Sequence, residues 1–218
     1  MRIDICTITR TLFIVIGFLL MPLATSANVD VADQALSECI SKAMKKAKVE
    51  ESTKLNKLKC HNKGIKNIDG IQAFTGLTSL SLFGNSIVNA DLTPLSKLTH
   101  LNLAKNKLKS LSIRALPSLE TLYLFKNELQ TLDFTGVSSL KKMRIMQNNL
   151  NALDITPLLS LEEAYLWDNK LEDLQITGLN KLKFLDVKQN PMPDELYDFY
   201  DKQKGITISH DGNADDWK

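Results

Sequence analysis

LTSLSLFGNSI, at residues 77–87, is the first of six near-copies of one pattern in this chain. Each copy has an apolar residue eight, five and three places before an asparagine, and another two places after it. The remaining copies are LTHLNLAKNKL, LETLYLFKNEL, LKKMRIMQNNL, LEEAYLWDNKL and LKFLDVKQNPM, and the asparagines recur every 21 residues at Asn85, Asn106, Asn127, Asn148, Asn169 and Asn190. A fixed period of this length is typical of a stacked array in which each repeat contacts its neighbours.

The alternation within each copy predicts a short strand, because strand side chains point to opposite faces with a period of two. Positions −5 and −3, counted from the asparagine, then face inward, and positions −6, −4 and −2 face outward. A buried carboxamide is costly unless it is hydrogen-bonded, so we interpret the six asparagines as a structural ladder that binds backbone groups. A second alternating segment after each asparagine, such as Leu132-Asp133-Phe134, predicts extended chain rather than helix on the opposite side.

The form LxxLxLxxNxL resembles the leucine-rich-repeat signature over about residues 58–192. Its 21-residue length and the LxxLDL second half are similar to the bacterial class called IRREKO. ALSECISKAMKKAK followed by LKCHNKGI resembles the start of secreted, internalin-like repeat proteins. The resemblance implies an α/β solenoid: a right-handed curved coil with a parallel β-sheet on its concave face, closed by an N-terminal helix and a C-terminal helix and strand.

The domain organisation follows from these patterns. Residues 1–27 read as a bacterial export signal, because Arg2 and Arg10 precede an apolar run and small residues follow it. We predict an N-terminal capping helix region at 28–57 and repeats at 58–192, with an irregular first copy and then starts at 77, 98, 119, 140, 161 and 182. Residues 193–218 are expected to form a cap, with a helix over 195–203 and a strand near 206–208. The predicted location is the periplasm or the exterior of the cell, with an uncleaved anchor as the alternative.

Two cysteines remain after removal of the export signal, Cys39 and Cys60. An even pair in an oxidising compartment is a disulfide candidate. Leu36, Cys39 and Ile40 share one helical face, and Cys60 takes the −3 position of the first repeat. A disulfide there would hold the helix over the open end of the stack, whereas two buried free thiols are the alternative. The sequence offers too few ligands near the cysteines for a metal site.

Charge is nearly balanced, with a formal net charge of +2, so no global field favours nucleic acid or an anionic membrane as partner. Locally, nine lysines lie between Lys42 and Lys66, while acidic residues are concentrated after residue 193. These ends are either two solvated caps or complementary surfaces for head-to-tail association. Apart from the export signal, the sequence has no segment that we expect to insert stably in a membrane.

The outward positions carry the functional signal of the sequence. At these positions, the middle and later copies of the repeat place aromatic, arginine and methionine side chains together. These residue types are enriched at protein interfaces. We call this set the aromatic patch: Phe83, Tyr123, Phe125, Arg144, Met146, Tyr165 and Trp167. It predicts binding of a protein partner, and the resemblance to internalin-like proteins implies a host or envelope protein. The alternative is an aromatic ladder that only stabilises the sheet.

Catalysis is not expected from this sequence. His61, His100 and His210 lie far from a predicted nucleophile or metal partner, and no phosphate loop, HExxH or CxxC motif is present. We therefore predict a non-enzymatic binding protein without a cofactor or metal. A structural envelope scaffold without a specific ligand and a glycan-binding module are the alternative functions.

Overall fold

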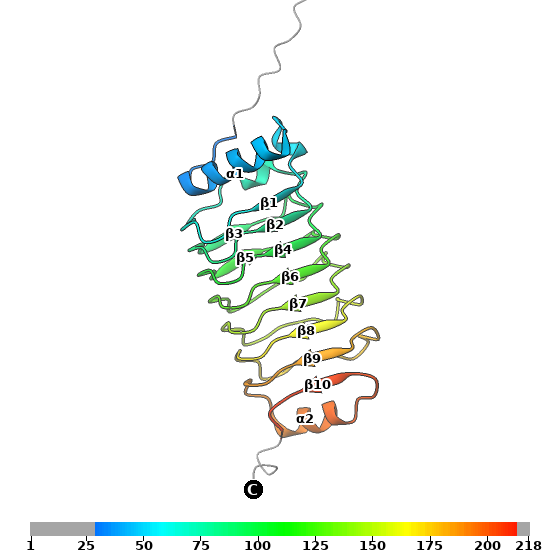
Figure 1. Cartoon of the computed structure of the whole chain (residues 1–218). Coiled ribbons are helices and arrows are strands. Elements are labelled where there is room, and N and C mark those ends of the chain that lie inside the picture. Colours follow the sequence, from blue (N-terminus) through cyan, green and yellow to red (C-terminus); the bar gives the residue numbers. More distant parts are fainter. Residues whose placement is uncertain (1–28, 213–218) are drawn as a thin grey trace, which may run out of the picture.

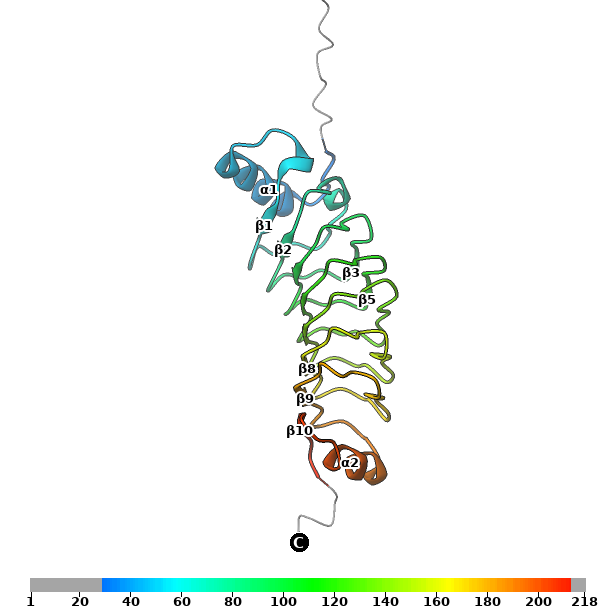
Figure 2. The ribbon, with the colours of Figure 1, turned by 90° about the vertical axis from the view of Figure 1, so that its right-hand side faces the viewer.

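The computed structural model describes residues 29–212, so the predicted export signal lies outside the described residues. The described chain forms a curved solenoid in which one coil follows another from the N-terminal helix to the C-terminal helix (Figure 1). Viewed from the side, the continuous sheet lines the concave face of the curve (Figure 2). The solenoid predicted from the 21-residue period is confirmed.

The concave face is a parallel sheet of eight strands in the order β1-β2-β4-β6-β7-β8-β9-β10. From β2 to β9, adjacent strands pair at equivalent repeat positions, as Leu122 does with Met143, because each of these coils has the same length. The first pairing, Leu58 with Leu80, spans one residue more, in keeping with the irregular first copy. The strands are β1 (Lys57–Lys59), β2 (Ser79–Ser81), β4 (His100–Asn102), β6 (Thr121–Tyr123), β7 (Lys142–Arg144), β8 (Glu163–Tyr165), β9 (Phe184–Asp186) and β10 (Thr207–Ser209).

The outer side of the solenoid has little regular structure. Strands β3 (Asn89–Asp91) and β5 (Ser110–Ser112) pair in a separate two-stranded sheet. The matching segments of the next three coils lack strand pairing in the described chain, although their inward residues, such as Phe134 and Ile155, are buried as expected. Between residues 77 and 192 the described chain contains no α-helix, as the alternating outer segments predict.

The six repeat asparagines are buried, with 7–9% of their surface exposed. Asn127 shows the arrangement: its Nδ2 donates to the carbonyl oxygens of Leu124 at 2.8 Å and Leu103 at 3.1 Å. Its Oδ1 accepts from the backbone N–H of Leu108 at 3.0 Å. One side chain therefore satisfies backbone groups of its own coil and of the preceding coil, which fixes the spacing between them.

Helix α1 (Gln34–Ala47) covers the N-terminal end of the core (Figure 1). Asp33 caps it by accepting from the N–H of Leu36 at 3.0 Å, and its other carboxylate oxygen accepts from the N–H of Lys66 at 2.8 Å. The predicted disulfide between Cys39 and Cys60 is confirmed, with the two Cα atoms 6.0 Å apart. Two short 3₁₀ turns, η1 (Ser52–Lys54) and η2 (Ile71–Ala73), complete this end.

Helix α2 (Asp194–Asp201) and strand β10 close the other end, so the helix and strand predicted there are confirmed. Two buried tyrosines anchor the helix by donating to backbone carbonyls, Tyr197 to Asn190 at 3.1 Å and Tyr200 to Leu174 at 2.8 Å. Burial raises the pKa of the Tyr200 hydroxyl, which therefore stays protonated and available as a donor. His210 stacks on the Tyr197 ring with 4.9 Å between ring centroids, and this contact ties β10 to α2.

Three outer turns are held by aspartates whose folded-state pKa values lie below 3.8. Hydrogen bonds from the threonine two residues further on are the main cause, and for Asp133, which also pairs with Arg114, the pKa falls to about 2. A depressed carboxyl pKa contributes stability that is present above the unfolded pKa and is lost as pH falls through the folded pKa. The three are Asp91, Asp133 and Asp154.

We therefore expect the urea midpoint of unfolding to fall as pH is lowered from 3.8 to about 2. The triple variant Asp91→Asn, Asp133→Asn, Asp154→Asn keeps an acceptor for the threonine N–H but no longer titrates. Its midpoint should change less over this range than that of the wild type. Identical pH dependence of the two proteins would contradict a stabilising role for the three carboxylates.

Candidate functional site

Every residue of the aromatic patch lies at the concave sheet or in the turn that follows it. Tyr123, Arg144 and Tyr165 are the last residues of β6, β7 and β8, and Arg144 pairs directly with each of the two tyrosines in the sheet. All members are partly exposed rather than covered by other side chains. The repeat register explains this placement, because a −4 residue lies between two inward apolar residues, as Arg144 does between Met143 and Ile145, and therefore points outward.

Arg144 is the centre of the patch. Its guanidinium carbon lies 5.4 Å from the ring centroid of Tyr123 and 4.9 Å from that of Tyr165. Two cation–π contacts on neighbouring strands hold the guanidinium in one orientation. The Nε atom of Arg144 is buried and has no hydrogen-bond partner within the described chain. The patch therefore contains a fixed cation with unused hydrogen-bonding capacity.

The −2 column forms a second part of the patch. The rings of Phe83 and Phe125 lie 6.3 Å apart, although they are two strands removed from each other. They approach because Ala104 lies between them and is too small to separate them. Ala104, expected at an outward position, is instead fully buried with 0% exposure. Met146 and Trp167 continue the column on the next two coils and remain partly exposed.

Phe184 is not part of the predicted aromatic patch, but its ring extends the site. Its ring centroid is 4.9 Å from that of Tyr165, which extends the apolar surface onto β9. The available signal was its outward −6 position beside the patch. Lys142 forms an ion pair with Glu163 on the next strand, and the Lys142 Nζ also lies 5.7 Å from the Tyr165 ring centroid. The cation of Lys142 is thus already neutralised within the sheet.

His61 differs from the expectation that the histidines stay away from nucleophiles. Its Nε2 lies 2.6 Å from the Oγ of Ser81 on the next strand, because the imidazole reaches diagonally across the sheet. Burial, together with the charge of Lys59, lowers the pKa of His61. Within the described chain no carboxylate orients this ring, so the pair lacks the third group of a catalytic triad. We interpret it as a polar link between β1 and β2.

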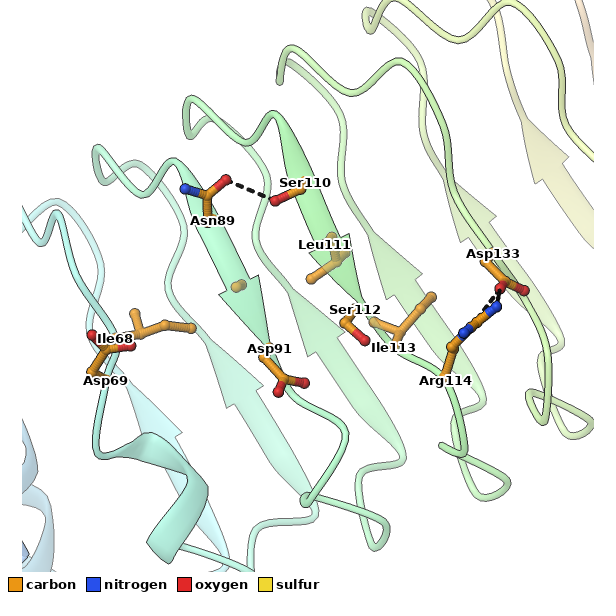
Figure 3. A pocket seen from close by; sticks show the side chains of 11 residues that line it. Ile68, Asp69, Asn89, Asp91, Ser110, Leu111, Ser112, Ile113, Arg114 and Asp133 are labelled. Atoms are coloured by element: carbon orange, nitrogen blue, oxygen red, sulfur yellow. Dashed lines mark hydrogen bonds and ion pairs between the residues drawn. The ribbon is translucent and has the colours of Figure 1, made fainter.

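The described residues contain no group of three or more His, Cys, Asp or Glu side chains that could hold a metal ion. On the outer side, a hollow of about 590 Å³ lies over β3 and β5 (Figure 3). Its lining combines apolar side chains, such as Leu111 and Ile113, with polar ones. Among the polar ones, Ser110 donates to Asn89 at 2.7 Å, and the Arg114 Nε donates to Asp133 at 2.6 Å. No residue of the aromatic patch lines this hollow.

Comparison with known proteins identifies the class. Residues 31–149 match the family model of the Endo-beta-N-acetylglucosaminidase EndoS LRR domain. Because this match covers more than half of the 218 residues, the chain belongs to this leucine-rich-repeat family. A search of curated protein sequences finds no match. No helix among residues 29–212 has the length and apolarity needed to cross a bilayer.

Solved structures give a consistent result. Internalin C2 from Listeria monocytogenes is 26% identical, with a TM-score of 0.56 over 85% of this chain and 96% of that one. TLR13, from a TLR13–ssRNA13 complex, is 27% identical, with a TM-score of 0.51 over 62% of this chain and 22% of that one. The functional domain of InlJ from Listeria monocytogenes is 20% identical, with a TM-score of 0.46 over 74% of this chain, which spans about half (51%) of that domain. The internalin-like resemblance predicted from the sequence is confirmed.

Proposed function

We propose that this chain is an exported, non-enzymatic leucine-rich-repeat protein that binds a protein partner through the aromatic patch. The observation that carries the proposal is the stack of Tyr123, Arg144 and Tyr165 on adjacent strands of the concave sheet. Tyrosine, tryptophan and arginine are the residue types that dominate the energetics of protein interfaces. A cluster of them facing solvent on a rigid sheet is what a recognition surface requires.

The geometry of the patch favours binding because its side chains are already ordered. Arg144 is held by two rings, and Tyr165 is held by Phe184 and by its hydroxyl, which lies 3.4 Å from a carboxylate oxygen of Glu163. Ordering a mobile side chain at an interface costs about 0.5–1.5 kcal/mol, so contacts that exist before binding reduce this loss. The sheet lines the concave side of the solenoid, a shape that would accommodate a convex partner surface (Figure 2).

Two observations support export. The bond between Cys39 and Cys60 belongs to an oxidising compartment, and residues 1–27 have the composition of an export signal. The likeness to internalin C2 from Listeria monocytogenes is in keeping with a bacterial source, and we propose a host or envelope protein as the partner. Periplasm and cell exterior are both compatible with the disulfide.

The double variant Tyr165→Ala, Trp167→Ala tests this function. One hot-spot side chain worth about 2 kcal/mol corresponds to about thirtyfold in affinity, so loss of both should weaken the partner complex by at least that factor and by up to about a thousandfold. The stability of the repeat should change little, because cross-strand aromatic pairs contribute about 0.2–1 kcal/mol each. Affinity capture with the immobilised protein identifies the partner, and its dissociation constant is then measured for both proteins.

Leu159→Ala is the matched control, since Leu159 is a large apolar side chain, 62% exposed, outside the aromatic patch. It should bind the partner like the wild type. Equal binding by the wild type and the double variant would contradict the proposal and leave the aromatic ladder of a structural scaffold. Binding of oligosaccharides instead of a protein, measured on the same immobilised protein, would replace it with glycan recognition.

A further inference from the structure

The concave face divides into two halves of opposite charge. Along the outward positions and the turn residue before each asparagine, the coils of β1 to β7 carry cations and the coils of β8 to β10 carry mainly carboxylates. The cations are Lys57, Lys59, Lys105, Lys126, Lys142 and Arg144, and the carboxylates are Glu163, Asp168, Asp186 and Asp211, with Lys188 among them. Within the described chain, only Lys142 of these cations forms an ion pair, and its partner Glu163 lies across the boundary.

Arg144 lies at this boundary and is equipped to receive an anion. Its stacked position between Tyr123 and Tyr165 leaves the edge of the guanidinium as its hydrogen-bonding surface. Its buried Nε has no partner, and a buried donor without a partner costs about 1–3 kcal/mol. Because this Nε is sealed from solvent, a carboxylate that approaches the exposed edge of the guanidinium would form its charge-assisted hydrogen bond with the terminal N–H groups.

We propose that the partner presents a short acidic segment, with aspartate or glutamate side chains, that lies over β1 to β7 and places a carboxylate on Arg144. This inference rests on the proposed function, because it names the chemistry of the partner at the same patch. On the concave sheet, the strands β1, β2, β4, β6 and β7 together span roughly 19 Å at about 4.8 Å between neighbours. An extended segment of about six residues covers this distance. Lys105 reinforces the site, since its Nζ lies 5.2 Å from the centroid of the Phe83 ring on the same face.

The cationic half of the concave face is short, which favours a peptide over a nucleic acid as the ligand. A polymer with a negative charge on every unit would continue over β8 and β9, where Asp168 and Asp186 repel it. A protein segment carries its acidic residues over a few positions and other side chains beyond them. Apolar side chains of the same segment would meet the rings of Phe83 and Phe125.

The experiment uses a fluorescent peptide of about eight residues with alternating glutamate and tyrosine, long enough to cover the cationic strands. Fluorescence anisotropy should show binding that weakens as salt increases, because exposed charges are screened. Arg144→Gln should weaken binding by about tenfold or more, the effect of removing a hydrogen bond to a charged group. Arg114→Gln is the matched control, since Arg114 lies on the outer side and should leave the affinity unchanged (Figure 3).

Three further probes complete the test: a glutamine–tyrosine peptide of the same length, oligothymidylate and a heparin fragment. The proposal expects the glutamate peptide to bind more tightly than all three. Equal affinity of the wild type and Arg144→Gln for the glutamate peptide, or tighter binding of either polyanion, would overturn it. The acidic segment and the proposed function can be tested separately. If Tyr165→Ala, Trp167→Ala no longer binds the captured partner but Arg144→Gln still does, protein recognition by the patch stands and the acidic segment is rejected.

Discussion

Replacing Asn127 with alanine is expected to lower the free energy of unfolding by about 3 kcal/mol or more. The substitution removes three hydrogen bonds at once, two donated to the carbonyls of Leu103 and Leu124 and one accepted from the N–H of Leu108. These backbone groups are buried in the middle of the solenoid, and each buried group left without a partner costs about 1–3 kcal/mol. Urea denaturation followed by circular dichroism measures the change.

Two related variants are compared with Asn127→Ala in the same measurement. Asn127→Asp keeps an acceptor for Leu108 but loses both donors, so it should also destabilise the protein strongly. Asn151→Ala removes an exposed asparagine from a later coil and should change the free energy of unfolding by less than about 0.5 kcal/mol. Similar stability of Asn127→Ala and Asn151→Ala would show that the buried ladder is dispensable.

The fold was predictable because every repeat places the same residue types in the same structural environment. The inward residues Leu122 and Leu124 and the buried Asn127 have equivalents in the same environment in each coil. The same residue types therefore recur at a fixed spacing. The disulfide was predictable for a related reason, since the positions of Cys39 on a helical face and Cys60 in a strand slot both follow from register. Because the coils repeat, contacts between neighbouring coils appear in the sequence as residue types at a fixed spacing.

The side-chain contacts of the concave face were less predictable, because register fixes direction but not rotamer or reach. Ala104 is buried only because Phe83 and Phe125 meet above it, which depends on residues 21 positions away on either side. His61 contacts Ser81 through a diagonal that its ring length permits. The stack around Arg144, in contrast, follows from the column Tyr123, Arg144, Tyr165, since parallel pairing places these residues side by side.

The same reasoning explains why fold and function separate in this protein. Inward positions are constrained by packing against neighbouring coils, whereas outward positions tolerate nearly any side chain without loss of the solenoid. Under the proposed function, the differences between one repeat and the next on the concave face, such as Ser81 on β2 against Tyr165 on β8, would determine partner specificity. Substitutions there should alter binding far more than stability.

Reduction of the bond between Cys39 and Cys60 is expected to lower the free energy of unfolding by about 3 kcal/mol, the chain-entropy value for a loop closed by residues 21 positions apart. The effect should be local, because each coil of a solenoid is stabilised mainly by its neighbours. Amide hydrogen exchange should therefore accelerate in α1, β1 and β2 and stay unchanged in β8 and β9. The variant Cys39→Ala, Cys60→Ala, treated with the same reductant, controls for effects unrelated to the bond. An unchanged urea midpoint on reduction of the wild type would mean that burial of Leu36 and Ile40 alone holds the helix over the first coil.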